Sequence, residues 1–326
     1  MKLAAIALPV LLVLAYPFVF SSPFPQHLMI LVMLNALLGT AWNLVGGFAG
    51  QVSLGQAIFF GAGAYTSTLL AQHAGLSPWL GMPAGAAVAA ALSVAIGYPC
   101  FRLSGHYFAI ATIAIGEILG IVITNWDFAG GAVGLFLPIA DQPGLRAMQF
   151  ENKLGYYYLL AGLLGFAVCL TAWLRRGRPG YYWRAIREDQ AAARSLGVHA
   201  TRYKQLAMAI SAALTAIAGT FYAQYVLFID PPSVLPLSLS IQICLVAVLG
   251  GVGTVVGPLL GAAVLIPLSE ATRLALGGSG RSLDLVIYGL AIMLIAVFEP
   301  AGLIGLARRL RRRPEALPRG SSLPIG

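Results

Sequence analysis

The segment RRGRPGYYWRAIREDQAAARSLGVHATRYK, residues 175–204, is the only long charged segment that lies between apolar runs of this chain. Only two of its residues are acidic, Glu188 and Asp189, and its basic residues are Arg175, Arg176, Arg178, Arg184, Arg187, Arg194, Arg202 and Lys204. Charged groups are costly to place in hydrocarbon, and loops rich in arginine and lysine remain on the cytoplasmic side of a membrane. The segment is therefore predicted to be a cytoplasmic loop with membrane spans on both sides.

This loop also has internal order. Pro179 and Gly180 are predicted to end the preceding helix, and Gly197 to end a short helix that follows. Four apolar residues recur near helical spacing with charged residues opposite them, namely Trp183, Ile186, Ala193 and Leu196. The pattern favours a short amphipathic helix. Charge alone leaves open whether this helix is a docking surface for a partner or a solvated loop held inside by its arginines.

The composition excludes a soluble fold. The 326 residues are 59% hydrophobic and only 10% charged, whereas soluble domains carry about 25% charged residues. The net charge of +9 does not indicate nucleic-acid binding, because most of the basic residues lie in the loop above and between Arg308 and Arg319. The three cysteines stand singly in apolar runs, so the sequence predicts no metal site. The chain is expected to be an all-α polytopic membrane protein.

The apolar runs predict about ten transmembrane helices, or eight if a long segment is re-entrant. A span needs about 20 residues, so the run 237–276 is too long for one. Its cluster of glycines around residues 250–257 predicts two shorter helices that meet there. The first apolar run, residues 3–20, is read as an uncleaved membrane helix, with a cleaved signal peptide as the alternative. Seven further spans are expected over residues 29–48, 50–72, 78–98, 106–124, 155–174, 205–228 and 283–298.

This arrangement defines a membrane domain over residues 1–307, with the cytoplasmic loop 175–204, and a basic cytoplasmic tail over residues 308–326. Both termini are expected in the cytoplasm, since their basic residues then obey the positive-inside rule. Residues 50–65 and 250–265 share a rhythm of glycine and alanine, which leaves an internal repeat open. Aromatic residues near span ends are expected to anchor at the membrane interface, namely Trp42, Trp79, Trp126, Tyr156 and Tyr157.

Four stretches, in order along nearly the whole chain, resemble one family. They are NLVGGFAGQVSLGQAIFFGAGAY (43–65), HYFAIATIAIGEILGIVITNW (106–126), RAIREDQAAARSLGVHATRYKQLAMAISAALTAIAGTFYA (184–223) and VLGGVGTVVGPLLGA (248–262). Together they resemble the LivM-type permeases of binding-protein-dependent ABC importers for branched-chain amino acids. The sequence departs from the family pattern at residues 129–134, where the usual threonine is Ala129, and at Gly120, where an arginine is frequent.

The resemblance implies a fold similar to the vitamin B12 importer permease, with about ten helices. It implies a bacterial inner-membrane protein that pairs with a second, LivH-like permease subunit. Its other implied partners are two cytoplasmic ATPase subunits and a periplasmic substrate-binding protein. Residues 184–197 look like the coupling helix that sits in a groove of the ATPase. The residues implied at this contact are Arg184, Arg187, Glu188, Ala192, Ala193 and Gly197.

The chain has no phosphate-cradling loop for ATP, because none of Lys2, Lys153 and Lys204 follows a glycine. ATP hydrolysis would therefore belong to another polypeptide. No Ser/His/Asp set, metal-ligand spacing or paired carboxylates appears, so the chain is predicted to be a transport subunit and not an enzyme, and to need no cofactor.

Polar residues inside spans are candidates for the translocation path. Gln51, Ser53 and Gln56 cluster where the third span opens irregularly, and they either line the path or satisfy backbone groups at the helix start. Glu117 is the only acid in the middle of the fifth span, and it either serves transport or bonds a neighbouring helix. Glu270 and Arg273 are predicted to form a local pair.

The sequence therefore predicts the permease subunit of an ATP-driven importer for leucine, isoleucine and valine. One alternative is the same architecture with another cargo, such as urea, another amino acid or a sugar. A second is an ion-coupled secondary transporter or channel that works alone. A membrane enzyme is disfavoured by the missing catalytic set.

Overall fold

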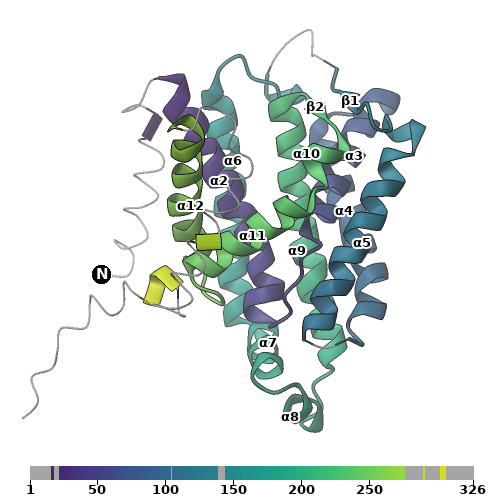
Figure 1. Ribbon diagram of the computed structural model, residues 1–326, viewed down its shortest axis with the longest axis vertical. Helices are drawn as coiled ribbons and strands as arrows, with labels where there is room; N and C mark the ends of the chain where they lie inside the picture. The colour runs from purple at the N-terminus through teal and green to yellow at the C-terminus, as the bar shows by residue number, and fades with distance from the viewer. Residues whose placement is uncertain are drawn as a thin grey trace, which may run out of the picture.

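The computed structural model describes residues 16–17, 22–103, 105–138, 144–275, 289–290 and 302–305 (Figure 1). Three expected parts lie wholly or almost wholly outside these residues: the span 3–20, the span 283–298 and the basic tail 308–326. The description below concerns the helices between them.

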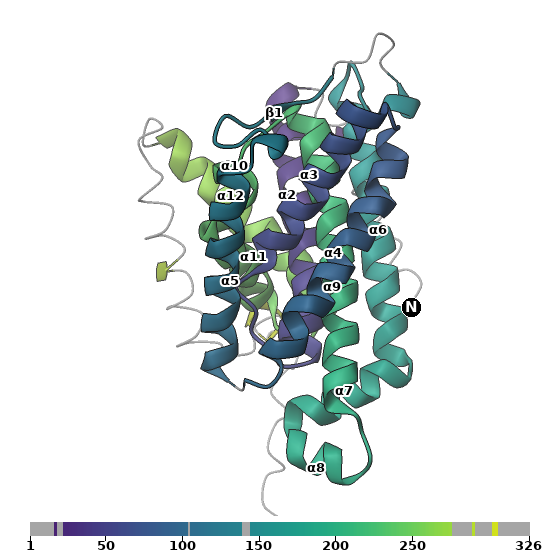
Figure 2. The ribbon, with the colours of Figure 1, turned by 90° about the vertical axis from the view of Figure 1, so that its right-hand side faces the viewer.

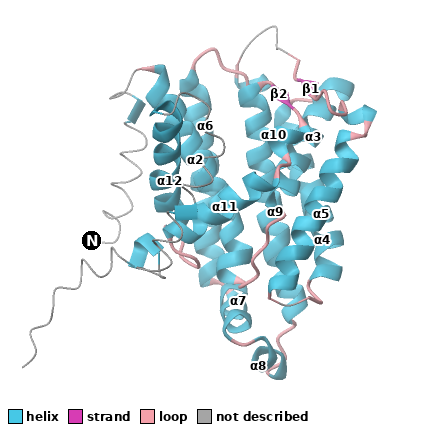
Figure 3. Cartoon of the chain, viewed as in Figure 1, coloured by secondary structure: helices cyan, strands magenta, loops and turns pink. Residues whose placement is uncertain are grey.

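The described chain is almost entirely helical (Figure 3). A single pair of two-residue strands, β1 (Leu135–Phe136) and β2 (Phe228–Ile229), runs antiparallel at the end of the molecule opposite α7 and α8 (Figure 1). Leu44–Phe48 continues α2 as a π-helix. The α-helices are α2 (Pro23–Asn43), α3 (Gln56–Ala74), α4 (Pro78–Cys100), α5 (His106–Thr124), α6 (Lys153–Arg176), α7 (Arg178–Glu188), α8 (Gln190–Ser195), α9 (Ala200–Val226), α10 (Pro231–Val234), α11 (Leu237–Gly250) and α12 (Gly257–Ala275).

Six segments of the described chain are long and apolar enough to cross a membrane, so the protein is polytopic. They are Pro23–Phe48, Pro78–Cys100, His106–Thr124, Lys153–Arg176, Ala200–Val226 and Pro231–Gly250. The prediction that the run 237–276 divides is confirmed, because α11 ends at Gly250 and α12 begins at Gly257. The expected third span corresponds to α3, which is not among the six and carries polar residues at both ends, including Gln56, Gln72 and His73.

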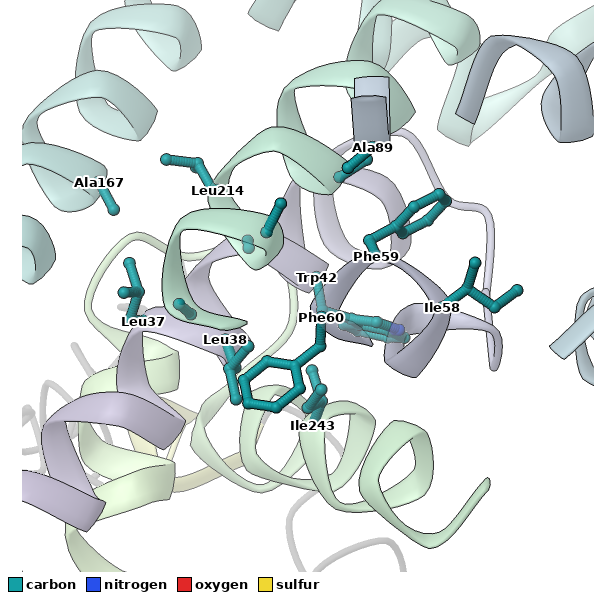
Figure 4. Packing of buried hydrophobic residues seen from close by; sticks show 14 of the residues in the cluster. Leu37, Leu38, Trp42, Ile58, Phe59, Phe60, Ala89, Ala167, Leu214 and Ile243 are labelled. Carbon is teal, nitrogen blue, oxygen red and sulfur yellow. The ribbon is translucent and has the colours of Figure 1, made fainter. Parts of the chain in front are cut away.

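Two helices organise the packing. α9 lies against α3 and α4, and α2 lies against α6, α11 and α12 as well as α9. Their contacts form one main core, and Figure 4 shows part of it, with labelled side chains from α2, α3, α4, α6, α9 and α11. Trp42 of α2 lies there beside Phe59 and Phe60 of α3, and all three are almost fully buried.

Glycines bring α3 and α9 into close contact. A Cβ on Gly63 would lie 2.0 Å from the carbonyl oxygen of Ala216, and a Cβ on Gly219 would lie 2.0 Å from that of Phe60. Small residues allow such approach between membrane helices, where packing replaces the hydrophobic effect as the driving force. Thr220 adds a bond across this contact, since its hydroxyl donates to the carbonyl oxygen of Gly63 at 3.1 Å.

The prediction of interfacial anchoring is wrong for three of the five aromatic residues. Trp42, Tyr156 and Tyr157 are 1%, 8% and 0% exposed. The indole nitrogen of Trp42 donates to the carbonyl oxygen of Ser53 at 2.7 Å, which satisfies its polar atom inside the core. Sequence position near a span end did not reveal that these rings face neighbouring helices. Trp79 and Trp126 keep 38% and 50% exposure, as an interfacial residue would.

The charged loop also differs in detail from the prediction. The preceding helix, α6, ends at Arg176, and Gly177 in extended conformation makes the break. Pro179 and Gly180 instead lie in the first turn of α7, where a proline is tolerated because the first amides of a helix have no partner. Asp189 then divides the expected single helix into α7 and α8. Gly197 follows the end of α8 with a positive φ of 84°, in keeping with its predicted role.

The glycine contact between α3 and α9 predicts that Gly219→Ala destabilises the fold. The added methyl would meet the backbone of Phe60, which cannot rotate away as a side chain would, and such overpacking costs about 1–3 kcal/mol. Gly165→Ala on α6 is the matched control, because nothing lies within 4 Å of a Cβ there. Thermal unfolding of the two purified variants in detergent should show a lower midpoint for Gly219→Ala alone. Equal midpoints would mean that α3 and α9 pack less tightly than described.

Candidate functional site

The helices α7 and α8 extend beyond one end of the helical bundle (Figures 1 and 2). They contain the arginine-rich sequence and form a projecting hairpin, here called the α7–α8 hairpin (residues 178–195). The carboxylate of Asp189 caps α8, since its Oδ1 accepts from the amides of Ala191 and Ala192 at 2.7 and 3.0 Å. The aspartate therefore both ends α7 and starts α8, which fixes the bend between them.

The hairpin has a small core that holds it to the bundle. Ile186, Ala193 and Ala200 are buried together, one from each of α7, α8 and α9. Trp183 is fully buried, and its indole nitrogen donates to the carbonyl oxygen of Tyr203 at 2.8 Å. These contacts make the hairpin and the first turn of α9 a single packed unit.

The outer face of the hairpin carries charged side chains and residues with small side chains. Arg184, Glu188 and Ala192 are exposed on it, and so is Gly197 just after it. Ala193 lies on the inner side, with 3% exposure. Leu196, which the periodicity placed on the apolar face, is 84% exposed, so that part of the prediction is wrong. The reason is that the chain leaves the helix at Ser195 and no longer follows the helical period.

Arg187 points back from the hairpin to the bundle. Its Nη1 donates to the carbonyl oxygen of Gly47 in the π-helix at 2.7 Å. Two glycines with positive φ make room for this side chain, Gly50 at 70° and Gly253 at 76°. A Cβ on Gly253 would lie 2.5 Å from Nη1 of Arg187, and a Cβ on Gly50 would lie 3.0 Å from its Cγ. The hairpin, the π-helix and the loop between α11 and α12 therefore meet at one guanidinium group.

Asn43 completes this meeting point, which we call the Arg187 junction (Asn43, Gly47, Arg187, Gly253 and Thr254). The side chain of Asn43 is fully buried. Its Nδ2 donates to the carbonyl oxygen of Thr254 at 2.7 Å, and its Oδ1 accepts from the amide of Gly253 at 2.8 Å. One amide group thus satisfies both a donor and an acceptor of the loop between α11 and α12, where the helical bonding pattern stops.

The polar cluster before α3 is also largely bonded. Ser53 and Gln56 are each 1% exposed. Nε2 of Gln56 donates to the hydroxyls of Ser211 and Thr215 on α9 at 2.7 and 2.8 Å. The amides of Leu54 and Ala57 donate to the hydroxyls of Thr112 and Ser240 at 3.0 and 2.9 Å. The start of α3 is therefore joined to α5, α9 and α11 by side chains that replace missing helical bonds.

Gln51 and Glu117 lie in more open positions. Gln51 is half-buried; its side-chain Nε2 donates to the carbonyl oxygen of Gly50 at 3.1 Å, and its backbone amide donates to that of Val45 at 2.9 Å. Glu117 is exposed in the middle of α5, so the predicted alternative of a buried glutamate bonded to a neighbouring helix does not hold within the described chain. Only Phe108 and Thr112 of α5 are buried, and Ile110, Ile118 and Ile121 are each about 60% exposed.

One smaller prediction can be compared directly. The pair of Glu270 and Arg273 is confirmed, with 3.3 Å between Oε1 and Nη1. Within the part of the chain that the structure describes, no group of three or more histidine, cysteine, aspartate or glutamate residues is placed to hold a metal ion.

A family model described as "Branched-chain amino acid transport system / permease component" matches residues 24–297. The chain belongs to this family. Membership makes it a multi-pass membrane permease, which is a transport component and not itself a catalyst. No solved structure matches the permease.

The permease is similar to curated relatives over most of its length. It is 32% identical to the high-affinity branched-chain amino acid transport system permease protein LivM of Salmonella typhimurium and to that of Escherichia coli. Each match covers 94% of this chain and 76% of the relative. It is also 25% identical to the corresponding permease protein LivH of Escherichia coli, over 83% of this chain and 91% of the relative.

Sequence reasoning missed the Arg187 junction of the permease. The sequence pattern assigns no role to Asn43, although a polar side chain inside an apolar span itself indicates a functional or bonded position. The glycine cluster that contains Gly253 predicts only a helix break. The connection between these residues and Arg187 depends on contacts separated by 140 residues or more, which local patterns do not reveal.

Proposed function

We propose that this permease carries leucine, isoleucine and valine across the inner membrane as part of an ATP-driven, binding-protein-dependent importer. The cargo is inferred from the relatives, whose names specify branched-chain amino acids. The observation that carries the mechanism is the projecting α7–α8 hairpin, which is bonded to the bundle at Trp183 and Arg187. A transporter that works alone has no need of such a hairpin.

The hairpin is proposed to be the contact for a separate ATPase. Arg184, Glu188, Ala192 and Gly197 lie on its exposed surface, where small residues let the helices sit close in a groove. Two further residues support this contact through the fold. Arg187 is bonded to Gly47, and Ala193 is packed inside the hairpin. With two ATPases in the complex, a second permease subunit would offer the other hairpin.

A LivH-like subunit is the proposed membrane partner, supported by the similarity of this chain to both LivM and LivH relatives. The exposed apolar side chains of α5, which include Ile110, Ile118 and Ile121, are the proposed contact. A periplasmic binding protein would deliver the amino acid at the end that carries β1 and β2. The finer architecture proposed is ten helices in a fold similar to the vitamin B12 importer permease, with both termini in the cytoplasm.

In this proposal the Arg187 junction transmits the ATPase motion. Closure of the ATPases displaces the hairpin, and Trp183 passes the movement to α9 through Tyr203. Arg187 passes it to the π-helix, and Asn43 passes it on to the loop between α11 and α12. The route therefore reaches two of the places where the described helices are interrupted, and a bundle can change shape most readily at such places.

The first experiment tests the function itself. The complete complex, reconstituted in proteoliposomes with its binding protein, should take up labelled leucine only when ATP is present on the hairpin side. Excess unlabelled isoleucine or valine should compete, while urea and glucose should not. Uptake driven by an ion gradient without ATPase subunits would contradict the proposal and favour a secondary transporter, and competition by urea or sugar alone would assign another cargo.

The second experiment tests the transmission route. Arg187→Ala removes the bond to Gly47 and keeps Arg184, Glu188 and Ala192 on the outer face of the hairpin, so the ATPases should still bind and hydrolyse ATP. Leucine transported per ATP should fall roughly fivefold to tenfold, the range expected for a residue that carries coupling. Arg178→Ala, at the other end of α7, is the control and should keep the ratio. An unchanged ratio in Arg187→Ala would exclude this route.

The third experiment concerns the path. We propose that Gln51 and Glu117 border it, and that the buried Ser53 and Gln56 hold its wall in shape from behind. A carboxylate beside the path would attract the ammonium group of an amino acid, so Glu117→Gln should raise the KM of uptake several-fold without loss of assembly. Glu151→Gln, an exposed loop residue, is the control. If KM does not change while the LivH-like subunit dissociates, Glu117 belongs to the subunit contact instead.

A further inference from the structure

A groove lies between the hairpin end of α4 and the connection from α8 to α9, apart from the Arg187 junction. Its volume is about 690 Å³, and its walls come from Val94 and Tyr98 on one side and from residues 197–202 on the other. Gln205 joins the two walls, because its Nε2 donates to the carbonyl oxygen of Ser93 at 2.8 Å. In Figure 2 the two helix ends lie side by side just above α8.

The rim of the groove is basic. Arg194, His199 and Arg202 line it, and no acidic residue does. Arg194 and Arg202 are exposed, and within the described residues neither forms a salt bridge. The nearest acid in sequence to Arg194 is Asp189, whose carboxylate is engaged at the amides that begin α8. Two guanidinium groups thus face the groove with no carboxylate beside them, which is suited to an anion.

The opposite wall is apolar and continues along the membrane span. Ala87, Ala91, Val94 and Tyr98 are all exposed and recur at helical spacing, so they form one stripe on α4. At 1.5 Å per residue this stripe is about 16 Å long, which is about half the thickness of the hydrocarbon core. Arg102 covers the Tyr98 ring at 5.3 Å and adds a further cation at the polar end.

From this pairing of a basic pocket with an apolar stripe, we propose that the groove binds one anionic phospholipid from the leaflet that faces the α7–α8 hairpin. The phosphate lies between Arg194 and Arg202, and an acyl chain lies along the stripe of α4. The groove sits at the ends of two spans, α4 and α9, which is the depth of lipid headgroups. A soluble anion would use the arginines but not the stripe, and a zwitterionic lipid would use the stripe but gain little from the arginines.

The binding also has a mechanical consequence. The groove lies at the connection where α8 ends and α9 begins. Near this connection, Nζ of Lys204 on α9 donates a hydrogen bond to Oε1 of Gln190 on α8. A lipid held there links α4 to the hairpin, so its headgroup stabilises one position of the hairpin relative to the bundle. Lipid binding depends on the groove and not on which cargo the permease carries.

The test uses the purified complete complex, equilibrated with mixed vesicles of phosphatidylcholine and phosphatidylglycerol, followed by native mass spectrometry of the lipids that remain bound. The unmodified complex should retain phosphatidylglycerol in preference to phosphatidylcholine. The double variant R194Q/R202Q should retain it roughly tenfold more weakly, since each basic residue near the surface contributes to anionic lipid binding. R194K/R202K, which keeps both charges, should lose less.

R175Q/R176Q is the matched control, because it removes the same charge from the exposed end of α6 on the same side of the membrane. An equal loss in this control would mean nonspecific attraction to a basic surface and would overturn the proposal. So would equal retention of the two lipids, displacement by millimolar inorganic phosphate, or loss of a partner subunit from R194Q/R202Q in place of lipid. If that variant does not fold, Thr201→Glu carries the same test, since it adds a negative charge to the groove in the first turn of α9, where a carboxylate is tolerated.

Discussion

The structure depends on satisfying backbone amides and carbonyls where membrane helices are interrupted. In hydrocarbon an unpaired peptide group costs several kcal/mol, so a break in a helix survives only if protein groups replace the lost bonds. The permease has such breaks at the π-helix Leu44–Phe48, at residues 50–55 and between α11 and α12. Trp42, Asn43, Thr112 and Ser240 supply the replacements at these points.

The same replacements connect parts of the chain that are distant in sequence. Asn43 bonds residues 253 and 254, and Arg187 bonds residue 47. Each interruption is therefore held by a side chain from another element as well as by local bonds, such as those of Thr254 with Gly251 and Gly257. The interruptions at the π-helix and between α11 and α12 both lie next to the hairpin that projects from the bundle, since Arg187 of the hairpin meets both.

Much of the fold follows from the sequence alone, and some of the site does not. The boundaries of α5 were predicted to the residue, and the division between α11 and α12 was predicted from glycines, because apolar period and helix breakers are local signals. Local signals also placed an ordered element in the charged loop. They failed for Trp42 and Tyr157, whose burial is decided by which helix lies opposite, and for Leu196, which lies beyond the end of α8 and is exposed. They also could not pair Arg187 with Gly47, since that bond is a property of the assembled bundle.

The length of α9 has a consequence for how the two membrane faces communicate. This helix has 27 residues and no proline, so it spans about 40 Å as one stiff rod. Its first turn is bonded to Trp183 of the hairpin. Its last turn leads into β2, which pairs with β1 in the loop between α5 and α6. α9 is therefore one continuous connection between the two faces, with no proline-induced kink between its ends.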